Sequence, residues 1–250
     1  MFKRLHKLIV FTVLILTTCS SAWSEPITKE QGDIIINELK NIRQLLERQK
    51  QPQPQQVQQP PKAEKITVKS GGTHTLGNSN APLVLIEYTD YQCSFCARFS
   101  NSTFPAIKKN LIDTGKVLFI QRDLPLDFHQ FASKAAQAVL CAGESGKFWE
   151  MKELLFKNSQ KLDLDSLAGY AKNIGLKPED FSACLASDKY AKELAEEVKY
   201  AQSVGITGTP SFVLGKQKNG VVEGFKIVGA LPYENFEAVA NELLATGNGK

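Results

Sequence analysis

The chain has 250 residues, of which 42% are hydrophobic and 22% charged, and its formal net charge is +4. Three of the cations, Lys3, Arg4 and Lys7, lie in a leader-like segment without anions, so the rest of the chain carries a formal charge of about +1. A balance this close to neutral gives no support for a nucleic acid or another polyanion as partner.

Residues 1–24 have the pattern of a secretory signal peptide. The cations are followed by an apolar stretch over residues 8–16 and by small residues that end at Ser24. Cleavage after Ser24 removes Cys19 and leaves four cysteines, so we expect a periplasmic or otherwise exported protein. Lipid anchoring through Cys19 is the less favoured alternative, because Thr18 is bulkier than the Gly, Ala or Ser usual in lipoprotein signals.

Residues 25–50 are predicted to form a helix that assembles the chain into a homo-oligomer. Apolar side chains recur with 4-3-4 spacing, at Ile35, Leu39, Ile42 and Leu46. Residues 51–65 follow, rich in Gln and Pro, and this composition favours an extended spacer. The stripe therefore needs a partner, and we expect a dimer first. The alternatives are a helix that folds back along the next domain, or one that frays in water.

The remainder, residues 66–250, alternates between strand-like and helix-like patterns, which predicts an α/β domain. Strands are expected at 68–74, 83–88, 116–121, 211–214 and 225–228, the last two joined as a hairpin through Asn219-Gly220. Helices are expected at 94–113, within an insertion over about 128–204, and at 233–245. Pro105 should kink the first of these helices because it lacks a backbone N–H.

Cys93 and Cys96 lie between the strand at 83–88 and the helix that follows it. At the first turn of a helix, unpaired N–H groups and the macrodipole favour a thiolate. The second cysteine, one turn later, can expel whatever the first has captured. The spacing therefore predicts a redox pair with Cys93 as nucleophile and Cys96 as resolving residue. A closed structural disulfide is the alternative, but so short a loop constrains the unfolded chain little.

Three motifs in this order resemble the DsbA-like branch of the thioredoxin superfamily. They are EYTDYQCSFC at 87–96, AVLCAGESGKFW at 138–149 and GITGTPSF at 205–212. The resemblance extends over about residues 67–244 and implies a thioredoxin-like fold with a helical insertion. It also implies thiol:disulfide exchange on exported proteins, with no cofactor and with a membrane redox partner.

The resemblance assigns further roles. Thr209 and Pro210 match the family's cis-proline turn, which exposes backbone to an extended substrate. Glu87 matches an acidic residue beneath the active site that helps proton transfer at the Cys96 sulfur, although a solvated strand-end Glu is the simpler reading. Asp90 and Arg122 are expected to be structural or surface charges. His129 is expected to be a capping or surface residue, because the sequence offers it no identifiable acceptor or acid.

The sequence favours neither direction of the reaction alone. Strongly oxidising relatives have a histidine between the cysteines, whereas Phe95 can neither donate a hydrogen bond nor carry charge. We expect the pKa of Cys93 near the middle of the range of about 3.5–7.5 for activated cysteines. Phe95, Thr209 and the N-terminal helix favour an isomerase or reductase, and the helical insertion favours an oxidase. A chaperone or metal-binding module is a third hypothesis.

Cys141 and Cys184 are the remaining cysteines of the processed chain. Four cysteines allow three connectivities, and pairing 141 with 184 keeps the redox pair intact while it joins two helices of the insertion. Such a disulfide could stabilise the fold by about 4 kcal/mol. A zinc or copper site from all four cysteines competes with this pairing, but it lacks a second CxxC and nearby histidines.

Overall fold

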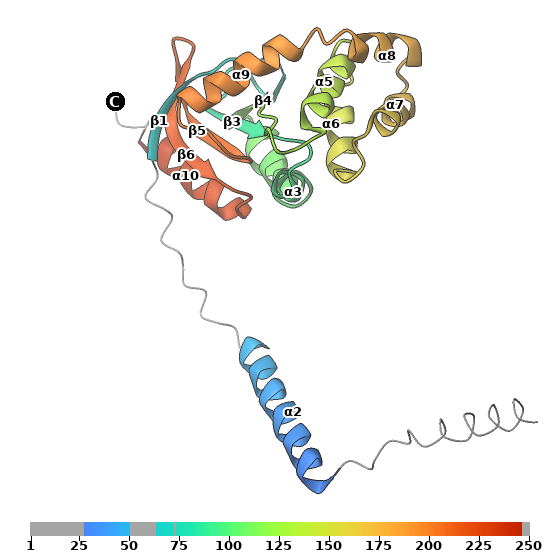
Figure 1. Ribbon diagram of the computed structural model, residues 1–250. Helices are drawn as coiled ribbons and strands as arrows, with labels where there is room; N and C mark the ends of the chain where they lie inside the picture. Colours follow the sequence, from blue (N-terminus) through green and yellow to red (C-terminus); the bar gives the residue numbers. More distant parts are fainter. Residues whose placement is uncertain (1–27, 51–63, 73, 247–250) are drawn as a thin grey trace, which may run out of the picture. The chain divides into compact units, whose positions relative to one another are not determined.

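The computed structural model describes residues 28–50, 64–72 and 74–246. The chain divides into two compact units, Met1–Gln59 and Pro60–Lys250 (Figure 1). The expected signal peptide, Cys19 and residues 51–63 of the expected spacer lie outside the described residues.

The first unit contains the helix α2, Lys29–Lys50. It begins with a reciprocal cap. The Thr28 N–H donates to Gln31 Oε1 at 3.0 Å, and the Gln31 N–H donates to Thr28 Oγ1 at 3.2 Å. Three residues of the apolar stripe are solvent-exposed, at 48% for Ile35, 59% for Leu39 and 50% for Ile42, and the side chain of the fourth, Leu46, lies outside the described ones. No helix among the described residues is both long and apolar enough to cross a membrane.

The second unit is built on a six-stranded sheet with the order β1-β6-β5-β3-β4-β2. Its strands are β1 Glu64–Lys69, β2 Thr75–Leu76, β3 Leu83–Thr89, β4 Val117–Asp123, β5 Ser211–Lys218 and β6 Val221–Val228. β3 and β4 are parallel and the other pairs are antiparallel. Parallel neighbours need a helical crossover, and the segment after the cysteines supplies it.

The expected bounds of the first strand, 68–74, are wrong, because they overlap β1 only at Val68 and Lys69. β1 begins earlier, at Glu64, so two residues assigned to the spacer belong to the sheet. After β1 the chain turns at Gly71 and Gly72, whose φ angles are +28° and +98°. A side chain is strained in this region of φ, and glycine is not. The turn lets β1 and β2 lie on opposite edges of the sheet.

Alternate residues of β3 face two different layers of helix. Leu83 and Leu85 pack with α10, Tyr233–Ala245, and with the helix that follows the cysteines. Val84 and Ile86 pack with α9, Ala191–Ser203. Because both faces are covered, β3 is buried along its whole length.

The helix expected at 94–113, with a kink at Pro105, is a run of short segments. They are α3 Ser94–Arg98, η1 Phe99–Thr103, α4 Phe104–Ile107 and η2 Lys108–Ile112, with π-helical hydrogen bonding in η1 and η2. Pro105 lies at the start of α4. Proline cannot donate the usual bond to the carbonyl four residues earlier, and a π-turn is one way to accommodate this loss.

The helical insertion consists of α5 Ala132–Gly143, α6 Phe148–Lys157, α7 Leu164–Asn173 and α8 Pro178–Ala186, and α9 returns the chain to the sheet (Figure 1). Its apolar core includes Met151 and Leu155 and also contains Tyr91, Cys93 and Cys96. The two cysteines therefore lie where the insertion meets the sheet.

Candidate active site

Cys93 is the N-cap residue of α3, directly before its first turn. Its Sγ lies 3.4 Å from the backbone carbonyl oxygen of Thr209. The Thr209–Pro210 peptide bond is cis, as the motif indicated, and β5 begins at the next residue. The structure thus brings together two motifs that are more than a hundred residues apart in the sequence.

The two thiols of the pair differ sharply. Cys93 is 6% exposed and Cys96 is fully buried. A hydrogen bond from Cys96 lowers the pKa of Cys93 to about 5, with help from Thr209 and the backbone N–H groups of Cys96 and Phe95, against the opposing effect of burial. Burial raises the pKa of Cys96 far above its ordinary value, and the neighbouring Cys93 adds to the rise. Cys93 is therefore the thiolate and Cys96 the thiol, and the value for Cys93 agrees with the sequence-based expectation.

Glu87 is not the solvated strand-end residue of the simpler reading. Its side chain is fully buried and its Oε2 accepts a hydrogen bond of 2.9 Å from Lys152 Nζ, on α6. The ammonium group also lies 4.9–5.8 Å from the centroids of four aromatic rings, those of Phe104, Phe119, Trp149 and Phe156. Both members of this ion pair are therefore sheltered from solvent. Sequence reasoning missed Lys152, because a lysine in a helical pattern usually faces water.

A second buried carboxyl lies close to this ion pair. Gln121 Nε2 donates both to Tyr91 and, at 3.2 Å, to Asp123 Oδ1. Burial raises the pKa of Asp123 to about 7, although Gln121 and Lys152 oppose the rise. Burial also raises the pKa of Tyr91 well above its usual range. Asp123 therefore exchanges a proton near neutral pH, a property that the sequence did not signal.

Asp90 holds the turn before the cysteines to the loop after β4. Its buried carboxylate accepts from the backbone N–H of Gln92 at 2.7 Å and of Leu126 at 2.8 Å, and it lies 2.8 Å from His129 Nδ1. Asp90 is therefore structural, as expected. His129, expected to be a capping or surface residue, has an acidic partner in Asp90. Thirty-nine residues separate the two, so no local pattern could have paired them.

Arg122 is also buried and structural. Its Nε donates to Glu197 Oε2 at 2.6 Å, and its Nη1 donates to the Lys69 carbonyl oxygen at 3.1 Å. These bonds tie β4 to α9 and to the end of β1.

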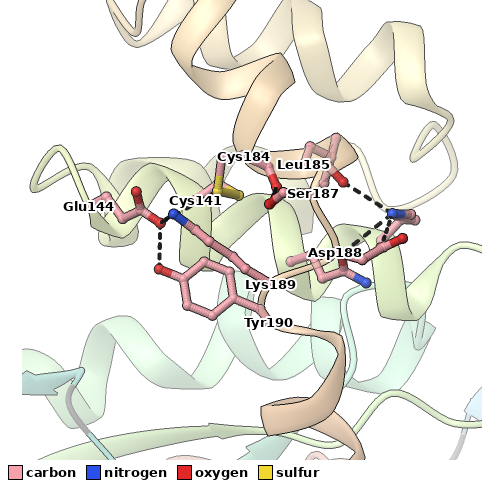
Figure 2. Close-up of a disulfide and its surroundings, with 10 residues drawn as sticks. Cys141, Glu144, Cys184, Leu185, Ser187, Asp188, Lys189 and Tyr190 are labelled. Atoms are coloured by element: carbon pink, nitrogen blue, oxygen red, sulfur yellow. Dashed lines mark hydrogen bonds and ion pairs between the residues drawn. A yellow bond between two sulfur atoms is a disulfide. The ribbon is translucent and has the colours of Figure 1, made fainter.

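Cys141 on α5 and Cys184 on α8 form a disulfide (Figure 2). The carboxylate of Glu144 lies beside it, with Oε1 3.4 Å from Cys184 Sγ, and it also contacts Tyr190 and Lys189. Among the described residues, only Cys141, Glu144 and Cys184 are grouped closely enough to hold a metal ion, and their two sulfurs are bonded to each other.

Comparison with known proteins agrees with this geometry. Residues 69–228 match the thioredoxin family, and the chain belongs to that family. Its structure resembles alpha-DsbA1 of Wolbachia pipientis, with a TM-score of 0.63 and 28% identity over 69% of this chain and 90% of that one. BdbD of Bacillus subtilis, in its oxidised form, has a TM-score of 0.62 and 24% identity over 73% and 99% of the two chains, which shows the fold alone. The chain therefore has the DsbA-like fold of the thiol:disulfide oxidoreductases.

The curated relatives match this chain over only part of their own length. Na(+)/H(+) antiporter NhaA 1 of Salinispora arenicola is 36% identical over 157 residues, which are 62% of this chain and 24% of that protein. The chain thus spans about a quarter of the length of such relatives, and their name describes a much longer protein.

Proposed function

We propose that the protein exchanges disulfides with exported polypeptides through Cys93 and Cys96, in the oxidising direction. The observation that carries the proposal is the difference in pKa and burial between the two thiols. Cys93 has a pKa of about 5 and lies beside the cis-proline turn, whereas Cys96 is buried. A stabilised Cys93 thiolate favours the reduced form of the enzyme, which makes its disulfide a strong oxidant.

The reaction proceeds in two exchanges. A client thiolate attacks Cys93 Sγ, so a client–Cys93 bond forms while the Cys93–Cys96 bond breaks, and the Cys96 thiolate takes up a proton. A second client thiolate then attacks the client sulfur of this mixed disulfide and expels Cys93 as a thiolate. The client loses two electrons and the enzyme pair gains them, and a membrane redox partner takes them away.

Two flanking features suit this scheme. The backbone at Thr209 and Pro210 aligns the client segment beside Cys93. Glu87, buried and paired with Lys152, helps to move the proton to the Cys96 sulfur.

The direction is tested by trapping thiols in the native exported compartment. Rapid acid quenching followed by alkylation should find Cys93 and Cys96 mainly as a disulfide, because an oxidase rests oxidised. A mainly reduced pair contradicts the oxidising direction. If a variant with both cysteines changed to Ser still assists client folding, the protein is a chaperone instead.

An oligomeric isomerase is the second candidate, and the exposed stripe of α2 favours it. A side chain such as Leu39 gains about 1.5–3 kcal/mol on full burial, so a stripe of this kind can drive association of two copies. Several active sites could then face one misfolded client.

The assembly is tested in the full chain with Ile35→Glu, Leu39→Glu and Ile42→Glu combined. Sedimentation should show an oligomer for the wild type and a monomer for the variant, and refolding of a scrambled disulfide protein should slow. Lys40→Glu, on the same helix, is the control for added negative charge. If the wild type sediments as a monomer, the proposed assembly is wrong. If the variant is monomeric but isomerises disulfides as fast as the wild type, isomerisation does not depend on assembly.

A further inference from the structure

A groove apart from the redox pair lies between α6 and the run of short segments that follows the cysteines. Its volume is about 400 Å³, and neither cysteine of the redox pair is among the residues that line it. Its apolar wall is formed by Leu76 on β2, Phe104 and Pro105 on α4, and Trp149 on α6. A pocket of this size takes one small molecule rather than a polypeptide. We call it the Phe104–Trp149 groove.

The groove lies beside an irregular stretch of helix. The π-helical segments η1 and η2 flank α4, and π-helical turns inside helices are frequent at functional sites. Phe104 and Trp149 are both only half-buried, although Trp149 packs against the core of the insertion and also against the core under the sheet. Aromatic side chains left partly uncovered in a concave site are typical of ligand pockets.

The polar side chains of the groove favour an anion. Among the described residues that line it, three are lysines, Lys108, Lys152 and Lys157, and one is a glutamate, Glu153. Lys152 is 3% exposed, and its Nζ lies 5.1 Å from the centroid of the Phe104 ring and 5.4 Å from that of a Trp149 ring. A buried ammonium group therefore lies beside the apolar wall, where it disfavours a cationic ligand.

The other two lysines are available to a ligand from opposite walls. Lys108 belongs to η2 and bonds to Asp113 at 2.7 Å, and Lys157 belongs to α6 and bonds to Glu153. Their side chains are 45% and 57% exposed, and ion pairs this exposed are weak. A ligand carboxylate can therefore share both ammonium groups at little cost, while the rest of the ligand lies against the aromatic rings.

We propose that the Phe104–Trp149 groove binds a small amphiphilic carboxylate, whose apolar body packs against Phe104 and Trp149 and whose head group bonds to Lys108 and Lys157. The ligand is a free molecule of the fatty-acid type, because a concave site between two helical walls admits a single chain and not a flat bilayer surface. The site goes beyond the thiol exchange proposed above, since it uses neither cysteine of the redox pair.

Fluorescence of Trp149 in the full-length protein tests the proposal. The chain has two tryptophans, Trp23 and Trp149, so Trp23→Phe leaves Trp149 as the one tryptophan reporter. Decanoate should change its emission saturably. Decanol, which has the same chain length without the charge, should bind roughly tenfold more weakly, and decyltrimethylammonium more weakly still. The signal is local, so decanoate that binds the exposed stripe of α2 does not contribute to it.

Variants in the same background locate the ligand. Lys108→Ser combined with Lys157→Ser should weaken decanoate binding roughly tenfold and leave decanol unchanged, because only the carboxylate uses these lysines. Lys172→Ser combined with Lys199→Ser removes the same charge from exposed positions on α7 and α9 and should change neither affinity. Ser100 also lines the groove, so Ser100→Leu should fill it and abolish binding of both ligands.

Each part of the proposal can fail separately. If decanoate gives no saturable change, or if Ser100→Leu binds it as the parent does, the site is wrong. If decanol binds as tightly as decanoate, or if the two double-lysine variants lose the same affinity, the carboxylate assignment is overturned. If phosphatidylglycerol vesicles change the emission of Trp149 as decanoate does, the groove serves a membrane lipid, and the assignment to a free carboxylate is overturned.

Discussion

The molecule contains two cysteine pairs, and their surroundings give them opposite chemistry. Cys93 lies at the start of α3, where hydrogen bonds from Cys96 and backbone N–H groups lower its pKa to about 5. Cys184 has the Glu144 carboxylate 3.4 Å from its sulfur, a negative neighbour that disfavours a thiolate. These surroundings suit the exchange proposed for the first pair and a lasting disulfide for the second.

The two regions are nevertheless linked through the core. Lys152, on a helix of the insertion that carries the disulfide, pairs with Glu87 on the strand that leads to the redox turn. The insertion therefore supplies part of the polar environment beneath the active site. Variants in each region measure how far the two are independent.

The largest effect is expected at the redox pair. Cys93→Ser should abolish dithiol exchange, whereas Cys96→Ser should leave Cys93 able to form mixed disulfides that persist, because the resolving thiol is missing. Non-reducing electrophoresis and mass spectrometry after mixing with a reduced client detect the adducts. Clients trapped on Cys96 in the Cys93→Ser protein would reverse the assignment.

A large loss of stability is expected from Lys152→Met. It leaves the Glu87 carboxylate buried without its partner, which costs about 3–5 kcal/mol, measured by urea unfolding. Lys157→Met, on the same helix but in an exposed pair with Glu153, should cost at most about 1 kcal/mol. Adding Glu87→Gln to Lys152→Met should restore part of the loss. If the two lysine variants lose the same free energy of unfolding, the buried pair stabilises the fold no more than the exposed pair does.

A somewhat smaller loss is expected when the second disulfide is removed. Replacing Cys141 and Cys184 together by Ala should cost about 2–4 kcal/mol of unfolding free energy, because the 43-residue separation is no longer closed. The pKa of Cys93, followed by thiolate absorbance, should stay near 5. A shifted Cys93 titration would show that the two pairs are coupled rather than separate.

A further effect is expected from pH, and only in the reduced protein. The folded-state pKa of Cys93, about 5, is below its ordinary value of 9.0, so the thiolate stabilises the fold above pH 9. This contribution declines as pH falls from 9 towards 5 and is absent below 5. The difference in unfolding midpoint between the reduced wild type and reduced Cys93→Ser should shrink over this range. A difference that stays constant from pH 8 to pH 5 would contradict the low pKa.

The sequence by itself determined the features that depend on local pattern. The buried strand before Cys93, the helix start at the cysteines, the hairpin around Asn219-Gly220 and the helix at 233–245 follow from hydrophobic period, turn residues and helix-terminal chemistry. The cis turn at Thr209-Pro210 was implied by the resemblance of its motif to the DsbA-like branch. These signals are contained within ten or so residues, so a single sequence is enough to read them.

The tertiary structure alone decided which polar side chains meet. Glu87 and Lys152 are 65 residues apart and Asp90 and His129 are 39 apart, yet each pair lies within 3 Å because separate elements converge on the redox turn. The raised pKa of Asp123 depends on burial that only the packed core creates. The position of β1 likewise depended on its partner β6, whose paired residues lie 152 to 162 positions later in the chain. Burial and long-range pairing are properties of the whole fold, and no local pattern of residues encodes them.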